Sequence, residues 1–117
     1  MQDLRQIPRW KVNQRARFNL SQSMDWYDCR LDDISLKGLR ITLSKSLNLS
    51  EPIGMSLYLE DGFALRVEGV PCWSKGSNGQ NSYGISFTRV FDEDKERIFQ
   101  FIQKHCGDQF KQNWWGG

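Results

Sequence analysis

Two short groups of polar residues have the types and the spacing that a ligand site needs. Arg5 and Arg9 form an R-x-x-x-R pair, and Asp33, Ser35 and Gly38 form a D-x-S-x-x-G sequence. Guanidinium groups bind phosphate oxygens through paired N–H donors and stack on flat rings. A carboxylate accepts two N–H bonds from one edge of a base such as guanine, and a nearby hydroxyl adds a donor or an acceptor. The two groups predict a site for a ligand that has phosphates and a guanine-like edge.

Each group also has an ordinary explanation when it is taken alone. The arginine pair is typical of a solvated charge cluster, and the second group is typical of a polar turn. Gly38 allows either a ligand or a neighbouring backbone to approach closely, because it has no side chain. Asp33 and Ser35 are two residues apart and would point to the same side of a strand. The occurrence of both groups in this order favours a binding site.

Composition limits the classes of function. The chain has 117 residues, 16 basic and 14 acidic residues and a net charge of +2, which does not suit a protein that coats nucleic acid. The first 20 residues hold five basic residues and one acidic residue, so the positive charge is concentrated in the leader. No apolar stretch is long enough to span a membrane and no signal peptide is visible, so we expect one cytoplasmic domain without a membrane span.

Cysteine and histidine offer little chemistry. Cys29, Cys72 and Cys106 are widely spaced, which predicts free thiols and neither a disulfide framework nor a C-x-x-C metal site. His105, the one histidine, falls on the apolar stripe of a helix, and a Cys–His pair that includes it stays open. No phosphate loop, metalloprotease motif or acid/base pair is present. We therefore expect no enzyme, no metal and no cofactor.

Hydrophobic periodicity predicts six strands and a closing helix. Alternation of apolar and polar residues predicts strands within 15–20, 26–35, 39–43, 55–59, 63–73 and 83–87. The alternation changes phase near Asp33, which indicates a strand end, a twist or a bulge. Asp61 and Gly62 predict a tight turn, and the composition of 75–81 predicts a loop. Ile98, Phe101, Ile102 and His105 form one helical face after an N-cap at Asp92.

Six short, mostly antiparallel strands suit a small closed barrel, which leaves no strand edge unpaired. The helix would cover one end or one side of that barrel. We therefore predict an all-β-dominated fold in three parts: a mobile basic arm (1–12), a barrel with a C-terminal helix (13–107) and a Trp-containing tail (108–117). The tail holds Trp114 and Trp115, which would either pack against the barrel or dock a partner.

With these motifs in this order, the chain resembles the PilZ domain family, a bacterial receptor module for cyclic di-GMP. The family signature is R-x-x-x-R followed by [D/N]-x-S-x-x-G, and the resemblance continues through 70–73, 83–87 and the helix. It covers roughly residues 4–105 and implies a six-stranded antiparallel barrel with a C-terminal helix. In many family members two arginines begin the first motif. Here Leu4 precedes Arg5, which favours one ligand molecule per protein.

The resemblance implies a role for each motif residue. The arginines would clasp the phosphates and stack on guanine, the acid and the hydroxyl would hold a guanine edge, and the glycine would leave room. Trp73 would stack on a base, and a core tryptophan at a strand end is the equal alternative. The implied binding set for cyclic di-GMP is Arg5, Arg9, Asp33, Ser35, Gly38 and Trp73.

The favoured function is a cyclic di-GMP receptor or adaptor. Its arm would close over the ligand and change the surface that it offers to an effector protein. The alternative is an interaction adaptor with the same fold that binds no nucleotide. A binder of single-stranded nucleic acid ranks third, because the total charge is near neutral.

Overall fold

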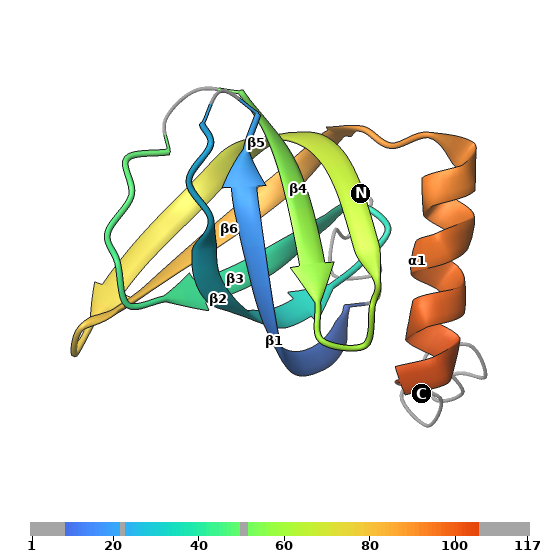
Figure 1. The fold of residues 1–117 in the computed structure, drawn as a ribbon, viewed down its shortest axis with the longest axis horizontal. Helices are drawn as coiled ribbons and strands as arrows, with labels where there is room; N and C mark the ends of the chain where they lie inside the picture. The colour runs from blue at the N-terminus through green and yellow to red at the C-terminus, as the bar shows by residue number, and fades with distance from the viewer. Residues whose placement is uncertain (1–8, 22, 50–51, 106–117) are drawn as a thin grey trace, which may run out of the picture.

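The computed structural model describes residues 9–21, 23–49 and 52–105. Its elements are β1 (Trp10–Leu20), β2 (Tyr27–Ile34), β3 (Gly38–Leu43), β4 (Ile53–Leu59), β5 (Ala64–Ser77), β6 (Gln80–Arg89) and α1 (Asp92–His105). The strands form a closed barrel in the order β1-β2-β3-β6-β5-β4, with antiparallel pairing between the neighbours (Figure 1). The predicted six-stranded antiparallel barrel with a C-terminal helix is confirmed.

The core fills the barrel and extends under the helix. Alternate strand residues such as Phe18, Leu31 and Ile41 are fully buried, and this matches the period of two in the sequence. The helix α1 stands beside the barrel (Figure 1) and buries Ile98, Phe101 and Ile102, the face that its spacing predicts. Three acidic residues in its first turn stabilise the positive end of the helix dipole.

A β-bulge in β2 explains the predicted phase change. Leu31 pairs with Ile41 and Asp33 pairs with Arg40, so Asp32 is an extra residue on β2. Strict alternation would place Asp33 on the inward side with Leu31. Because the bulge shifts the phase, Ile34 becomes the next inward residue with no exposure, and the two acidic side chains both lie on the outer face.

The structure corrects two of the predicted segments. Residues 75–81 form a hairpin and not a loop, because β5 runs to Ser77 and β6 begins at Gln80. Asn78 and Gly79 have φ values of 52° and 78°, as a two-residue hairpin turn requires. The first strand begins at Trp10 and not at residue 15, so residues 10–12 of the predicted arm belong to β1. Of the rest of that arm, the structure describes Arg9, and residues 1–8 lie outside the described residues. The predicted tail, residues 108–117, also lies outside them.

Candidate functional site

One row of residues crosses four strands on the outer surface of the barrel. Asp33 of β2 pairs with Arg40 of β3, Arg40 pairs with Gly84 of β6, and Gly84 pairs with Trp73 of β5. Antiparallel neighbours that are directly opposite point to the same face of the sheet. The pairing therefore brings two predicted site residues, Asp33 and Trp73, onto one face although 40 positions separate them in the sequence.

The Asp33 carboxylate is held between two guanidinium groups. Arg9 Nε lies 3.2 Å from Oδ1, and Arg40 Nε lies 3.2 Å from Oδ2. The Asp33 side chain is only 11% exposed, whereas that of Arg9 is 51% exposed. Burying a carboxylate is costly unless cations and hydrogen bonds compensate for the lost hydration, and these two cations do so. The structure thus brings together Arg9 and Asp33, one residue from each sequence motif.

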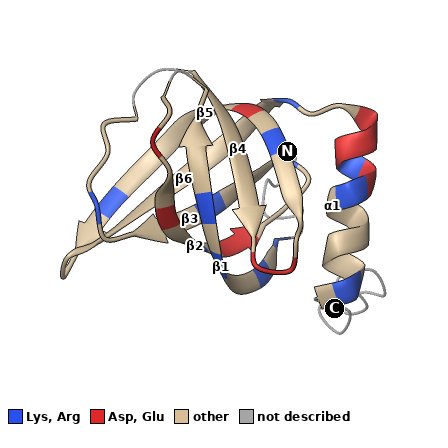
Figure 2. Ribbon diagram, in the orientation of Figure 1, with Lys and Arg blue, Asp and Glu red and all other residues tan. Residues whose placement is uncertain are grey.

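The neighbouring Asp32 forms a second ionic cluster that the sequence analysis did not single out. Its carboxylate contacts Arg30 Nε at 2.5 Å and Arg40 Nε at 3.6 Å. Thr42 donates its hydroxyl to Asp32 and lies 2.8 Å from the Ser82 hydroxyl. Figure 2 shows that basic and acidic residues both occur along the strands of the barrel. The outward position of Arg40 could be read from its apolar neighbours, but its acidic partners depend on the β2–β3 register.

Ser35 and Gly38 build the turn between β2 and β3. Because β2 ends at Ile34, the expectation that Ser35 projects beside Asp33 from one strand is not met. The Ser35 hydroxyl accepts hydrogen bonds from the backbone N–H groups of Lys37 (3.0 Å) and Gly38 (3.1 Å), and the residue is 1% exposed. The sequence left open whether a ligand or a backbone lies close to Gly38. The structure places a backbone there, the carbonyl of Ile85.

Trp73 lies on the outer surface and is 44% exposed, so it is not a core residue. Its indole covers Gly84: a Cβ atom at that glycine would come within 2.3 Å of the indole Nε1. An exposed flat ring is available for stacking on a base. Arg5, the remaining predicted site residue, lies outside the described residues.

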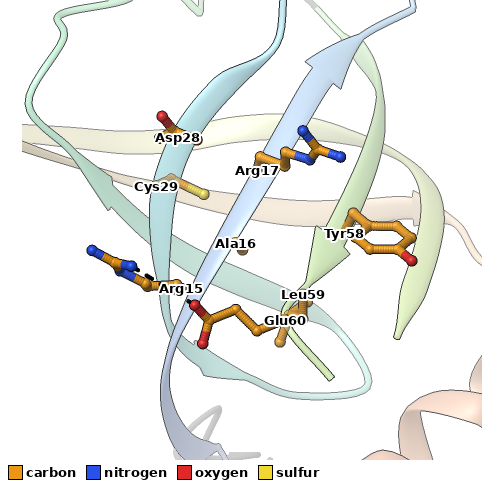
Figure 3. Close-up of a pocket in the computed structure, with 8 residues that line it drawn as sticks. All are labelled: Arg15, Ala16, Arg17, Asp28, Cys29, Tyr58, Leu59 and Glu60. Atoms are coloured by element: carbon orange, nitrogen blue, oxygen red, sulfur yellow. Dashed lines mark ion pairs between the residues drawn. The ribbon is translucent and has the colours of Figure 1, made fainter. Parts of the chain in front are cut away.

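A hollow of about 440 Å³ lies elsewhere on the barrel, over β1, β2 and β4 (Figure 3). It contains none of the predicted site residues. Among its lining residues are Arg15, Arg17, Cys29, Tyr58 and Glu60. Burial raises the pKa of the Cys29 thiol to about 12, and the negative charges of two nearby aspartates add to the effect. The thiol therefore stays protonated at neutral pH and is a weak nucleophile.

This pKa gives a first testable prediction. Cys29 should react with iodoacetamide at pH 8 about a thousandfold more slowly than an ordinary exposed thiol, because only the thiolate attacks. Cys72 is exposed and serves as the internal comparison. Peptide mass spectrometry over a time course, with Cys106→Ser to remove the third thiol, measures both rates. Equal alkylation of Cys29 and Cys72 would contradict a raised pKa for the half-buried Cys29 thiol.

In residues 9–21, 23–49 and 52–105, no three His, Cys, Asp or Glu side chains gather as metal ligands. Within the same part of the chain, no helix has the length and apolar character that crossing a membrane requires.

Comparison with known proteins identifies the family of the chain. The family model described as "PilZ domain" matches residues 3–104, so the chain belongs to the PilZ domain family, whose members are receptors and adaptors. The comparison with curated proteins gives no significant match.

Solved structures show the same fold at low sequence identity. The inhibitor of motility MotI (DgrA) of Bacillus subtilis is 14% identical, with a TM-score of 0.69 over 92% of this chain and 53% of that chain. MrkH of K. pneumonia in its apo state is 15% identical, with a TM-score of 0.67 over 96% and 55%. The PilZ domain of CeSA from a cellulose-synthesizing bacterium is 16% identical, with a TM-score of 0.59 over 86% and 96%. The chain thus spans about half the length of MotI and MrkH.

Proposed function

We propose that the protein is a bacterial, cytoplasmic receptor domain that binds cyclic di-GMP and acts on an effector protein without catalysing a reaction. The observation that carries the proposal is the Arg9–Asp33 contact on the barrel face that also exposes Trp73. One group that suits phosphate, one that suits the edge of guanine and one that suits its flat face lie on a single surface. Membership in the PilZ domain family supports this ligand.

Binding would exchange the partners of Arg9 and Asp33. The guanine N1–H and N2–H donors would bind the Asp33 carboxylate, which Arg9 partly covers without ligand. Arg9 would then turn to the phosphates, to which a guanidinium donates two parallel hydrogen bonds. In this proposal Arg5 is a second phosphate ligand and Trp73 stacks on a base. The turn at Gly38, between β2 and β3, shapes the edge of the site next to Asp33. A direct contact from Ser35 to the ligand stays a prediction.

Closure of the arm before β1, residues 1–9, over the ligand would change the surface that an effector protein reads. The ligand acts by differential affinity for the open and closed arrangements. Ordering a chain segment costs free energy, so the arginine–phosphate contacts and stacking must exceed that cost.

Calorimetric titration with cyclic di-GMP, with GTP and cyclic GMP as controls, tests the proposal. Arg9→Ala should weaken binding at least about tenfold, because one charge-assisted hydrogen bond contributes about 1.5–3 kcal/mol. The matched control is Arg15→Ala, which removes an 87% exposed arginine from β1, the strand that follows Arg9, and should change affinity less than about twofold. Unchanged affinity in Arg9→Ala would refute the proposed site.

The alternative function is an adaptor that uses the fold without a nucleotide. It is favoured by the fact that both Asp33 oxygens already have cationic partners. On this alternative, cyclic di-GMP causes no change in the amide chemical shifts of the labelled protein. A partner would then be recovered in pull-down experiments and lost when residues 108–117 are removed.

A further inference from the structure

Arg40 lies in the row between Asp33 and Trp73 on the outer surface of the barrel, and the proposed function gives it no contact with the ligand. Its Nε atom is buried between Asp32 and Asp33, at 3.6 and 3.2 Å from their carboxylates. The side chain as a whole is nevertheless 41% exposed. The exposed area therefore belongs to atoms other than Nε. The acidic pair holds the Nε atom and leaves other atoms of the side chain accessible to solvent.

A ligand that contacts both Asp33 and Trp73 must also lie close to Arg40. Asp33 and Trp73 are separated by β3 and β6, and three strand spacings correspond to about 14 Å. Arg40 and Gly84 occupy the two intermediate positions of the row. The indole of Trp73 covers Gly84, so Arg40 is the side chain that lies between that indole and Asp33 in the row. A ligand that contacts both Asp33 and the indole therefore passes over Arg40.

The donor and acceptor pattern of this pair matches guanine. The Watson–Crick edge of guanine presents two adjacent donors, N2–H and N1–H, followed by the O6 acceptor. Asp33 is an acceptor and the adjacent Arg40 is a donor, so the two residues complement that order. Adenine has one donor, N6–H, and one acceptor, N1, on this edge. In the orientation of guanine it would turn the N1 acceptor toward the Asp33 carboxylate and the N6 donor toward Arg40, and in any orientation it lacks the second N–H for the carboxylate.

We propose that Arg40 is a specificity-determining residue that donates to O6 of the guanine whose N1 and N2 donors bind Asp33. This role rests on the proposed function. A base edge fits Arg40 better than a phosphate does, because a phosphate would add negative charge beside Asp32 and Asp33. Arg9 is better placed for phosphate, since its side chain is more exposed and contacts only one of these acids.

The test measures affinity for three cyclic dinucleotides: cyclic di-GMP, cyclic di-AMP and the analogue built from 6-thioguanine. The thio analogue keeps N1–H and N2–H and replaces O6 with sulfur, a weaker acceptor. We expect Arg40→Met to lower the preference for cyclic di-GMP over cyclic di-AMP at least tenfold. The wild-type protein should prefer oxygen to sulfur at position 6, and Arg40→Met should not distinguish them.

Arg30→Met is the matched control, because Arg30 also pairs with Asp32 on the same face and is 56% exposed. Its preference for cyclic di-GMP over both analogues should stay within twofold of wild type. If Arg40→Met does not fold, Arg40→Lys replaces it, because it keeps a cation beside the two acids. Arg40→Lys lacks the planar pair of donors and should therefore lose most of the preference for oxygen over sulfur.

A residue that only orients Asp33 would leave the oxygen-over-sulfur preference intact in the Arg40 variants, and that result overturns the proposal. The role of Arg40 is also overturned if the wild-type protein binds cyclic di-GMP tightly and Arg40→Met keeps the full preference for cyclic di-GMP over cyclic di-AMP. That result leaves the receptor function standing. A wild-type protein that binds no cyclic di-GMP overturns the receptor function itself and this role with it.

Discussion

Asp33→Ala is expected to weaken cyclic di-GMP binding about a hundredfold or more. The carboxylate would accept two N–H bonds from one guanine, and two hydrogen bonds to a charged acceptor contribute about 3 kcal/mol or more together. The loss is large because the substituted site is buried and water cannot easily replace the missing acceptor. Isothermal titration calorimetry at fixed salt measures the change.

The variant should still fold, because Arg40 keeps Asp32 as an ionic partner after the substitution. Asp33→Asn should bind with an intermediate affinity, since its amide oxygen still accepts one bond without a charge. Asp28→Ala, which removes an exposed acid from the same strand, is the matched control and should bind like wild type. An Asp33→Ala protein that binds as tightly as the Asp28→Ala protein would exclude Asp33 from the site.

Gly38→Ala is expected to destabilise the barrel by about 3 kcal/mol, a value at the upper end for overpacking a closely packed position. A Cβ atom at this position would lie 2.3 Å from the backbone oxygen of Ile85. That oxygen belongs to β6, which pairs with β3 beginning at Gly38↔Ser86. Neither backbone can move away without breaking the ladder that closes the barrel. Equilibrium unfolding in urea, followed by tryptophan fluorescence, measures the loss.

Gly76→Ala provides the comparison, because it makes the same substitution in a strand of the β5–β6 hairpin. The closest contact of a new Cβ there is the Asn81 Oδ1 atom at 3.0 Å, at the end of a side chain that can turn aside. We expect a change of less than about 1 kcal/mol for that variant. Equal stability of the two alanine variants would show that the close approach at Gly38 does not constrain the fold.

Local patterns in the sequence were sufficient for the architecture. Alternation and the turn residues at Asp61 and Gly62 define the strands, and the helical spacing that includes Phe101 defines the one face that α1 buries. These signals depend on near neighbours in the chain, and for that reason they can be read without the fold. The polar composition of residues 75–81 predicts a loop, whereas the structure has a two-residue turn at Asn78 and Gly79 that continues the pairing of β5 and β6.

The sequence by itself also determined the types of group in the candidate site, namely arginines, an acid and an aromatic ring, and left the exposure of that ring open. Only the tertiary structure decided their arrangement. The β2 bulge places Asp33 on the outer face, and the β2–β3 register sets Arg40 beside it. Strand pairing across β6 then brings Trp73 into the same row. The phase change near Asp33 left a strand end, a twist and a bulge open, because the residues that lie opposite one another on two strands depend on how the whole barrel packs.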